Sequence, residues 1–249
     1  MRYVIHRGIL TGWHFLYQGR EYNFWGMEGG VYIRHQKFME EVSGPVLAKS
    51  GSLTHWNDKS NKTIIIEQRH ITVFQTADPT IMLAEFRVVL EPAEGEVFLI
   101  ADREHGGLQF RAHNDVAAAP AKSEGKATFL LPEEGSNAEI DLDIPWAAMT
   151  YGLNGHWYGV QLMNDPQNPK PTLFSAYRDY GRLGACTQLK IRAGQPLTLK
   201  YRVWVIEGKT RDRAEYSGKY GAFVNPPEVR VYSYTSDKTG RMLWGENYQ

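Results

Sequence analysis

Residues 62–101 read KTIIIEQRHITVFQTADPTIMLAEFRVVLEPAEGEVFLIA, and this stretch decides the fold. Three runs within it are rich in β-branched residues and largely alternate between apolar and polar side chains: Lys62 to Ala77, Ile81 to Leu90 and Glu96 to Ala101. A period of two is typical of β-strands. The residues between the last two runs, 91–95, have the Pro and Gly chemistry of a hairpin turn. The stretch therefore predicts successive antiparallel strands.

The same pattern extends over most of the chain. Further strands are expected at Gly30 to His35, Ala138 to Leu142, His156 to Met163, Thr187 to Ile191, Leu197 to Glu207 and Val229 to Tyr234. One helix is expected from Thr210 to Phe223, with Thr210 as its N-cap, and the prolines that follow end it. Many short strands without alternating helices predict an all-β fold class, a large antiparallel β-sandwich with one short C-terminal helix. We expect a single sandwich domain over residues 1–249, with 225–249 as a C-terminal extension.

Composition excludes several classes of partner. The 28 Lys and Arg residues balance 28 Asp and Glu residues, and a nucleic-acid partner would need a basic surface, so we expect none. No apolar run approaches the roughly 20 residues that a membrane-spanning helix needs. We therefore expect a soluble protein without a membrane span, and no signal peptide is visible after Met1. The single cysteine, Cys186, excludes a disulfide framework and is expected to be a buried, inert thiol rather than a nucleophile.

A loop between residues 159 and 185 indicates a ligand class. It joins prolines and Asx residues to the run Tyr177-Arg178-Asp179-Tyr180, which we expect to be strand-like. A rigid polar loop beside aromatic faces and a guanidinium fork suits a polyhydroxylated ligand such as a sugar. A loop-rich sandwich can show the same features for structural reasons alone.

A second motif runs from Asp102 to His113. On a strand, Gln109, Arg111 and His113 share one face, which either looks into a ligand groove or meets solvent. Glu104-His105 precedes a Gly-Gly pair that allows close backbone approach.

Metal and phosphate motifs are missing from the sequence. None of the eight histidines forms the helical pair of a zinc protease, and the arginines near the histidine motifs would repel a cation. We expect no cofactor and no transition-metal requirement, with a divalent metal as the minority alternative. No phosphate-binding glycine loop and no GxSxG elbow occurs.

The order and spacing of these motifs resemble an uncharacterised bacterial family labelled PmoA-type methane oxygenase, which is common among carbohydrate-degrading bacteria. The matching segments lie between about His6 and Phe223: His6-Arg7-Gly8, Asn23-Phe24-Trp25, Gly30 to His35, Trp56, Glu67-Gln68-Arg69, Gly106 to Arg111, Pro145-Trp146, Asp165-Pro166-Gln167-Asn168-Pro169, Arg178-Asp179-Tyr180-Gly181 and Tyr201-Arg202. A membrane copper oxygenase would need spanning helices, so the label is misleading for this chain.

The resemblance implies a carbohydrate-related protein in the periplasm or secreted. Galactose mutarotase-like proteins offer an architectural analogy. The chain departs from the family at Ile5, where a first histidine is usual, and at Glu104-His105-Gly106, where Lys-Glu-Gly is usual. The resemblance therefore implies no chemistry for those positions in this chain.

We predict a carbohydrate-active protein, an enzyme that acts on a sugar or oxidised glycan by acid/base proton transfer. Its partner would be a small molecule or oligosaccharide. The alternatives are a noncatalytic carbohydrate-binding module and, third, a structural or assembly protein. The proton-transfer candidates are His6, His35, Glu104, His105 and Asp165. The substrate-binding candidates are Arg7, Trp13, Trp25, Arg69, Arg111, His113, Asn168, Arg178 and Tyr180. Six of these are expected to converge on one concave site: His6, Arg7, His105, Arg111, Asp165 and Arg178.

Overall fold

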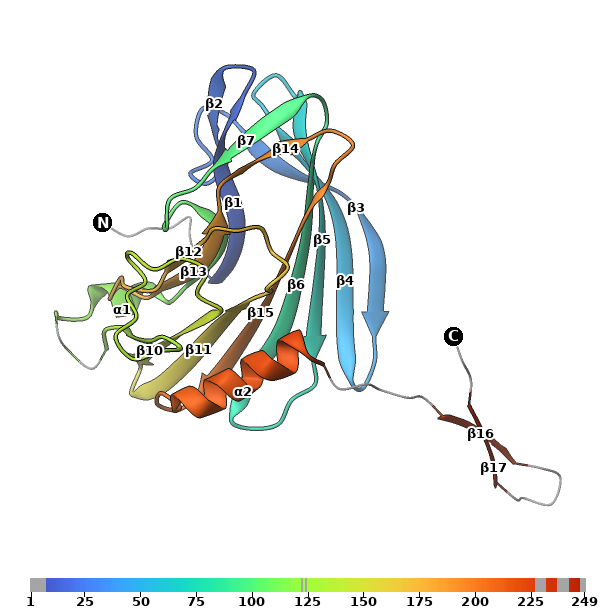
Figure 1. Ribbon diagram of the computed structural model, residues 1–249, viewed down its shortest axis with the longest axis vertical. Helices are drawn as coiled ribbons and strands as arrows, with labels where there is room; N and C mark the ends of the chain where they lie inside the picture. Colours follow the sequence, from blue (N-terminus) through green and yellow to red (C-terminus); the bar gives the residue numbers. More distant parts are fainter. Residues whose placement is uncertain (1–7, 122, 124, 227–231, 237–241, 247–249) are drawn as a thin grey trace.

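Two antiparallel sheets face each other in a β-sandwich (Figure 1). The computed structural model describes residues 8–121, 123, 125–226, 232–236 and 242–246, with side chains up to residue 226. The predicted all-β fold class is confirmed. The described helices are α1 (Asn114–Ala118) and α2 (Arg213–Val224), and neither is long and apolar enough to cross a membrane.

The larger sheet has eight strands in the order β3-β4-β5-β6-β15-β11-β10-β9. Their bounds are β3 (Tyr32–Ser43), β4 (Leu47–Asn57), β5 (Thr63–Phe74), β6 (Thr80–Pro92), β15 (Leu197–Glu207), β11 (His156–Asn164), β10 (Trp146–Leu153) and β9 (Thr128–Leu130). Strands β5, β6 and β15, which carry the clearest alternation, form its centre.

The smaller sheet has seven strands in the order β12-β13-β8-β1-β7-β14, and β2 pairs with β1. Their bounds are β12 (Thr172–Ser175), β13 (Arg182–Thr187), β8 (Gly106–Arg111), β1 (Gly8–Tyr17), β7 (Glu96–Ile100), β14 (Leu189–Arg192) and β2 (Arg20–Asn23). Strands β7 and β8 run end to end along β1, since Ile100 is opposite His14 and Gly106 is opposite Trp13.

The core lies between the sheets and is rich in aromatic rings. Trp13 and Phe15 of β1 are completely buried, and their ring centroids lie 6.5 and 6.4 Å from that of Trp56 on β4. Because side chains alternate along a strand, His14 lies on the opposite face of β1, turned away from the core. We call this face of the smaller sheet its outer face.

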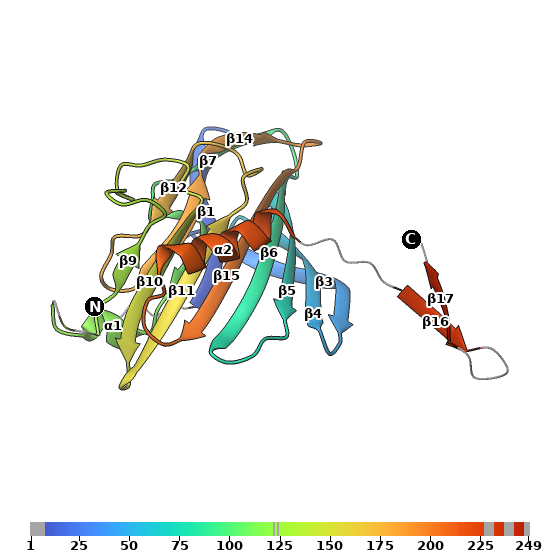
Figure 2. The same cartoon turned by 60° about the horizontal axis from the view of Figure 1, so that its bottom comes forward.

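Helix α2 lies on the outer face of the larger sheet (Figure 2). Its buried residue Tyr216 packs against Trp146 and Trp204, at ring distances of 5.5 and 5.9 Å. The N-cap is Asp212, whose Oδ1 accepts the backbone N–H of Glu215 at 2.8 Å, rather than the predicted Thr210.

Three local predictions need correction. Residues Ala138 to Leu142 do not form a strand: a turn closes where the backbone N–H of Asp141 bonds Asn137 O at 2.8 Å, and Leu142 makes only an isolated bridge to Leu173. The run from Tyr177 to Tyr180 is likewise a loop rather than strand-like. Thr187 to Ile191 is interrupted between β13 and β14. The predicted strand from Val229 to Tyr234 lies partly outside the described residues. Its described end belongs to β16 (Tyr232–Ser236), which pairs with β17 (Met242–Glu246).

Candidate functional site

A five-residue loop, Ala101–His105, leaves the smaller sheet between two neighbouring register positions of β1. Asp102 shapes it, because its Oδ1 accepts the backbone N–H groups of Glu104 and His105, both at 2.7 Å. Strands β8 and β13 approach each other closely below the loop. A Cβ on Gly107, whose φ is +77°, would lie 1.9 Å from the carbonyl oxygen of Ala185 on β13.

Two histidines beside this loop each pair with a carboxylate. His105 Nδ1 lies 2.8 Å from Asp102 Oδ2, and His14 Nδ1 lies 3.3 Å from Glu21 Oε1. The two imidazole rings meet edge to face, with centroids 6.2 Å apart. Burial acts to raise the pKa of Asp102, but the hydrogen bonds from His105 and from two backbone amides outweigh it and lower that pKa. Asp102 is therefore an anion that accepts a hydrogen bond from Nδ1 of His105.

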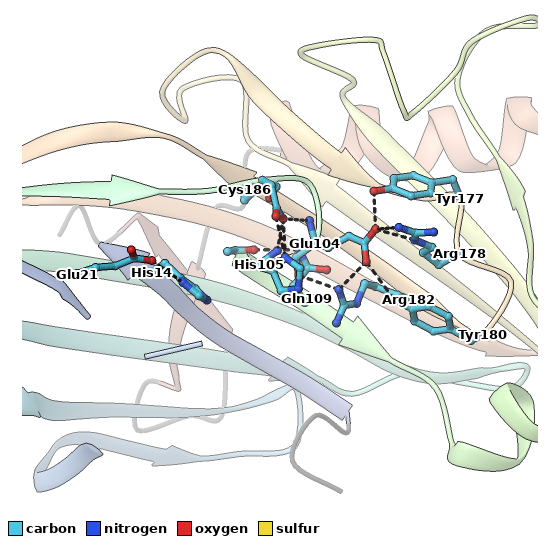
Figure 3. A network of polar contacts seen from close by, with 12 residues as sticks. His14, Glu21, Glu104, His105, Gln109, Tyr177, Arg178, Tyr180, Arg182 and Cys186 are labelled. Carbon is cyan, nitrogen blue, oxygen red and sulfur yellow. Dashed lines mark hydrogen bonds and ion pairs between the residues drawn. The ribbon is translucent and has the colours of Figure 1, made fainter. Parts of the chain in front are cut away.

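Glu104 is the centre of the polar network in Figure 3. Its carboxylate accepts hydrogen bonds from Tyr177 Oη at 2.9 Å, Arg178 Nε at 2.6 Å and Tyr180 Oη at 3.3 Å. Arg182 Nη1 lies 3.3 Å from the same carboxylate. Burial acts to raise the pKa of Glu104, but the bonds from Arg178 and Tyr177 and the two guanidinium charges outweigh it and lower that pKa. Glu104 is thus held in its ionised form.

The floor of the site comes from β8 and β13, where Arg111 and Arg182 are register partners. The Arg111 guanidinium lies 4.5 Å from the Tyr180 ring centroid, and that of Arg182 lies 5.6 Å from the Trp25 ring centroid. Both arginines are largely buried, and Arg111 donates to the backbone oxygens of Tyr180 and Gly181. Cation–π contacts of this kind hold guanidinium and aromatic groups in a fixed arrangement.

Together these groups border a cavity of about 500 Å³ on the outer face of the smaller sheet. We call it the histidine cavity. It is lined by His14, Asn23, Trp25, Gly26, Glu28, Glu104, His105, Arg111, Tyr180 and Arg182. Ionisable groups of both signs and two aromatic rings therefore converge in one hollow.

The structure brings together part of the predicted site. Glu104, His105, Trp25, Arg111 and Tyr180 line the histidine cavity, and Arg178 bonds Glu104 beside it. His6 and Arg7 lie outside the described residues.

Three predicted site residues belong elsewhere in the sandwich. Trp13 is completely buried in the core, so it has no face to offer a ligand. Arg69 of β5 points into the space between the sheets, where it bonds Glu67 at 2.7 Å and Thr11 of β1 at 2.5 Å. The smaller sheet therefore separates it from Arg111, which lies on the outer face of that sheet. His35 is exposed on β3 of the larger sheet and lies against Phe38, at a ring distance of 4.6 Å.

Three more have local or separate roles. Asp165 borders a different cavity, on the outer face of the larger sheet. Asn168 is buried, and its amide bonds Asn164 and the backbone of Lys200, each at 2.8 Å. His113 caps α1 by accepting the backbone N–H of Asp115. Of the four described residues among the six expected to converge, His105 and Arg111 line the histidine cavity and Arg178 lies beside it, whereas the expectation is wrong for Asp165.

Sequence reasoning missed His14, Glu28, Arg182 and the role of Asp102. An Asp three residues before a His in a turn is a usable signal for Asp102, because such a carboxylate can cap the turn and reach the imidazole. His14 and Glu21 had no such signal, since only the β1–β2 hairpin brings them together.

Cys186 is buried beneath the loop, and its Sγ donates to Asp102 O at 3.0 Å. Burial raises the pKa of the thiol to about 12, which agrees with the expected inert cysteine. Within the described part of the chain, no three His, Cys, Asp or Glu side chains gather to hold a metal ion. The lack of a metal requirement stays a prediction.

Comparisons with known proteins place the chain in a family. The heparan sulfate lyase HepC from Pedobacter heparinus is similar at 9% identity and a TM-score of 0.34, over 87% of this chain and 28% of the lyase chain. No curated protein matches. A family model without any oxygenase designation covers residues 2–220. The chain belongs to this family, which is described as a family of unknown function, DUF6807.

Proposed function

We propose that the protein is a carbohydrate-active enzyme that moves a proton on a sugar or oxidised sugar bound in the histidine cavity. The observation that carries this proposal is the pair formed by His105 Nδ1 and Asp102 Oδ2, 2.8 Å apart, at the border of a cavity of about 500 Å³. A carboxylate at Nδ1 fixes the tautomer that carries the proton there. Nε2 of His105 is then the basic nitrogen that accepts a proton from the substrate.

His14 is the second proton-transfer group in this proposal. It lines the same cavity, and its ring lies edge to face with that of His105. In this proposal one imidazole removes a proton from the substrate and the other returns it.

The remaining lining residues would bind the sugar. Trp25 and Tyr180 supply rings on which the apolar face of a sugar can pack. Arg111 and Arg182 place positive charge where an oxyanion develops on the substrate. We assign Glu104 a positioning role instead of the predicted proton transfer, since its lowered pKa keeps it ionised and two arginines engage it.

A noncatalytic carbohydrate-binding module is the second candidate. The observation in its favour is that Glu104 neutralises Arg178 and Arg182, while the His105 side chain is 48% exposed. Such a site can bind a sugar without excluding water from a reaction.

Solvent isotope exchange tests the proposal. The protein is incubated in D₂O with glucose, glucuronate and galacturonate, free and as oligosaccharides, and deuterium in the sugars is followed by NMR and mass spectrometry. We expect deuterium incorporation or a new product, slowed about 100-fold or more by His105→Asn and by Asp102→Asn.

His156→Asn is the matched control. His156 forms the same kind of pair with Glu207, at 3.0 Å, but does not line the histidine cavity, so this variant should exchange as the wild type does. Saturable binding without exchange would favour the binding module. Neither binding nor exchange with any of these sugars would overturn both candidates.

A further inference from the structure

A second hollow adjoins the histidine cavity. Its volume is also about 500 Å³, and it is lined by His14, Arg20, Glu21, Tyr22, Asn23, Glu28, Gly29, Val31, Asp58 and Lys59. We call it the hairpin hollow, because most of its lining comes from the β1–β2 hairpin and the turn after it. The two hollows share His14, Asn23 and Glu28.

The shared residues form a fixed boundary between the hollows. His14 and Asn23 are register partners across the β1–β2 hairpin. The Asn23 side chain accepts the backbone N–H of Gly26 at 2.6 Å, and its backbone oxygen accepts that of Glu28 at 3.1 Å. The turn that carries Glu28 is therefore tied to the hairpin, and His14 is exposed to both hollows at once.

The hairpin hollow offers the same mixture of groups as the histidine cavity. Arg20 and Lys59 are exposed cations, and the partly exposed ring of Tyr22 is backed by Phe15 at 5.6 Å. Asp58 is held by the backbone N–H of Ser60, at 2.8 Å, and by that of Lys62, at 3.0 Å. Its carboxylate is therefore oriented before any ligand arrives.

We infer, on the basis of the proposed function, that the substrate is a sugar chain of at least two units that passes His14 and occupies both hollows. Each hollow alone falls within the roughly 300–1,000 Å³ of a small-molecule site. Two such hollows in series, with a histidine at their junction, suit an oligosaccharide better than a monosaccharide. Arg20 and Lys59 are specificity residues for the second unit and leave the first unit unaffected.

Chain-length dependence of binding tests this inference. Isothermal titration calorimetry is run with galacturonic acid and its oligomers of up to four units, and with glucose and the matching cello-oligosaccharides. In the series that binds, we expect Kd to fall about tenfold or more between the monosaccharide and the oligomers. The double variant Arg20→Ala/Lys59→Ala should abolish that gain and leave the monosaccharide Kd within about twofold.

Arg34→Ala/Lys37→Ala is the matched control, because this exposed arginine and lysine lie on β3 of the other sheet. It should retain the full gain. A monosaccharide that binds as tightly as its oligomers, or a gain that survives Arg20→Ala/Lys59→Ala, would overturn the two-unit site while the proposed function stands. Loss of monosaccharide affinity in that variant would also overturn it. No binding in either series would overturn the proposed function together with it.

Discussion

Arg182 Nη1 donates to the backbone oxygen of Glu104 at 2.9 Å and to its carboxylate at 3.3 Å. Arg182 opens β13 in the smaller sheet, whereas Glu104 lies in the loop that leaves that sheet between β7 and β8. One guanidinium thus ties the loop to the sheet through both backbone and side chain. Since the same loop carries Asp102 and His105, this contact fixes the position of the imidazole–carboxylate pair.

We expect Glu104→Gln to destabilise the protein. The amide keeps the shape of the side chain but leaves the buried Arg182 and the half-exposed Arg178 without a negative partner. Removing a hydrogen-bonded charge of this kind costs about 1–3 kcal/mol, which urea unfolding monitored by tryptophan fluorescence can measure.

Glu94→Gln is the control for this variant. Glu94 pairs with Lys62 at 3.2 Å on the surface, where its side chain is 67% exposed. Exposed pairs contribute about 0–1 kcal/mol, so this change should be close to neutral. Equal losses in the two variants would contradict the assigned role of Glu104.

The contribution of Glu104 should also depend on pH. Its pKa is lowered in the folded protein from the ordinary 4.5, so the stabilisation is fully present above that value. It is lost as the pH falls through the lowered folded pKa. The difference in free energy of unfolding between wild type and Glu104→Gln should therefore shrink below about pH 4.5. Urea titrations at a series of pH values measure it, and a difference that stays constant would argue against the ion pair.

Much of the fold could be predicted because the central strands show a clear alternation of apolar and polar residues in their own sequence. The alternation in residues 197–207 gives β15 with its observed bounds, and residues 62–77 and 81–90 give β5 and β6 to within a few residues. The prediction did not include β4 or β10. The first is broken by polar residues and the second is buried on both faces, so neither shows a clear period of two.

The site was harder to predict because long-range pairing decides which face a residue occupies. Arg69 and Arg111 both lie in strands with alternating side chains, and both were predicted to face a ligand. In the structure Arg69 faces the core and Arg111 faces away from it. The face of each arginine is fixed by the pairing of its own strand: β5 pairs with β4 and β6 in the larger sheet, and β8 pairs with β1 and β13 in the smaller one. Glu104 and His105 were found by sequence because the adjacent glycines indicated a special loop, which the structure contains.

Glu67 and Arg69 form a separate polar cluster in the sandwich interior, and we expect Glu67→Gln to be strongly destabilising. Glu67 is completely buried and accepts hydrogen bonds from Trp56 Nε1 and Arg69 Nε, both at 2.7 Å. An amide offers one acceptor in place of two and leaves Arg69 uncompensated, at a cost of about 3 kcal/mol. Chemical denaturation measures this loss.

Glu85→Gln tests the role of burial in that result. Glu85 pairs with Arg202 on the outer face of the larger sheet, where its side chain is 35% exposed. Water reaches the side chain at position 85, whereas position 67 is completely buried, so the loss should be smaller than for Glu67→Gln. The reverse order would show that the Glu67 cluster is not stabilised by its charge pairing.

Gly107→Ala should prevent β8 from pairing with β13 in the smaller sheet. Gly107 has a φ of +77°, and a Cβ there would overlap the carbonyl oxygen of Ala185, so β8 and β13 would have to separate.

Gly95→Ala is the comparison, because Gly95 has a φ of +63° but no atom within 4 Å of the added Cβ. The left-handed backbone alone costs an alanine about 1–2 kcal/mol, so Gly95→Ala should fold with a modestly lower Tm. The overlap at Gly107 should cost on the order of 4 kcal/mol or more and abolish the cooperative transition in differential scanning calorimetry. A Gly107→Ala protein that unfolds at the same temperature as Gly95→Ala would show that β8 and β13 pair differently around the loop that carries His105.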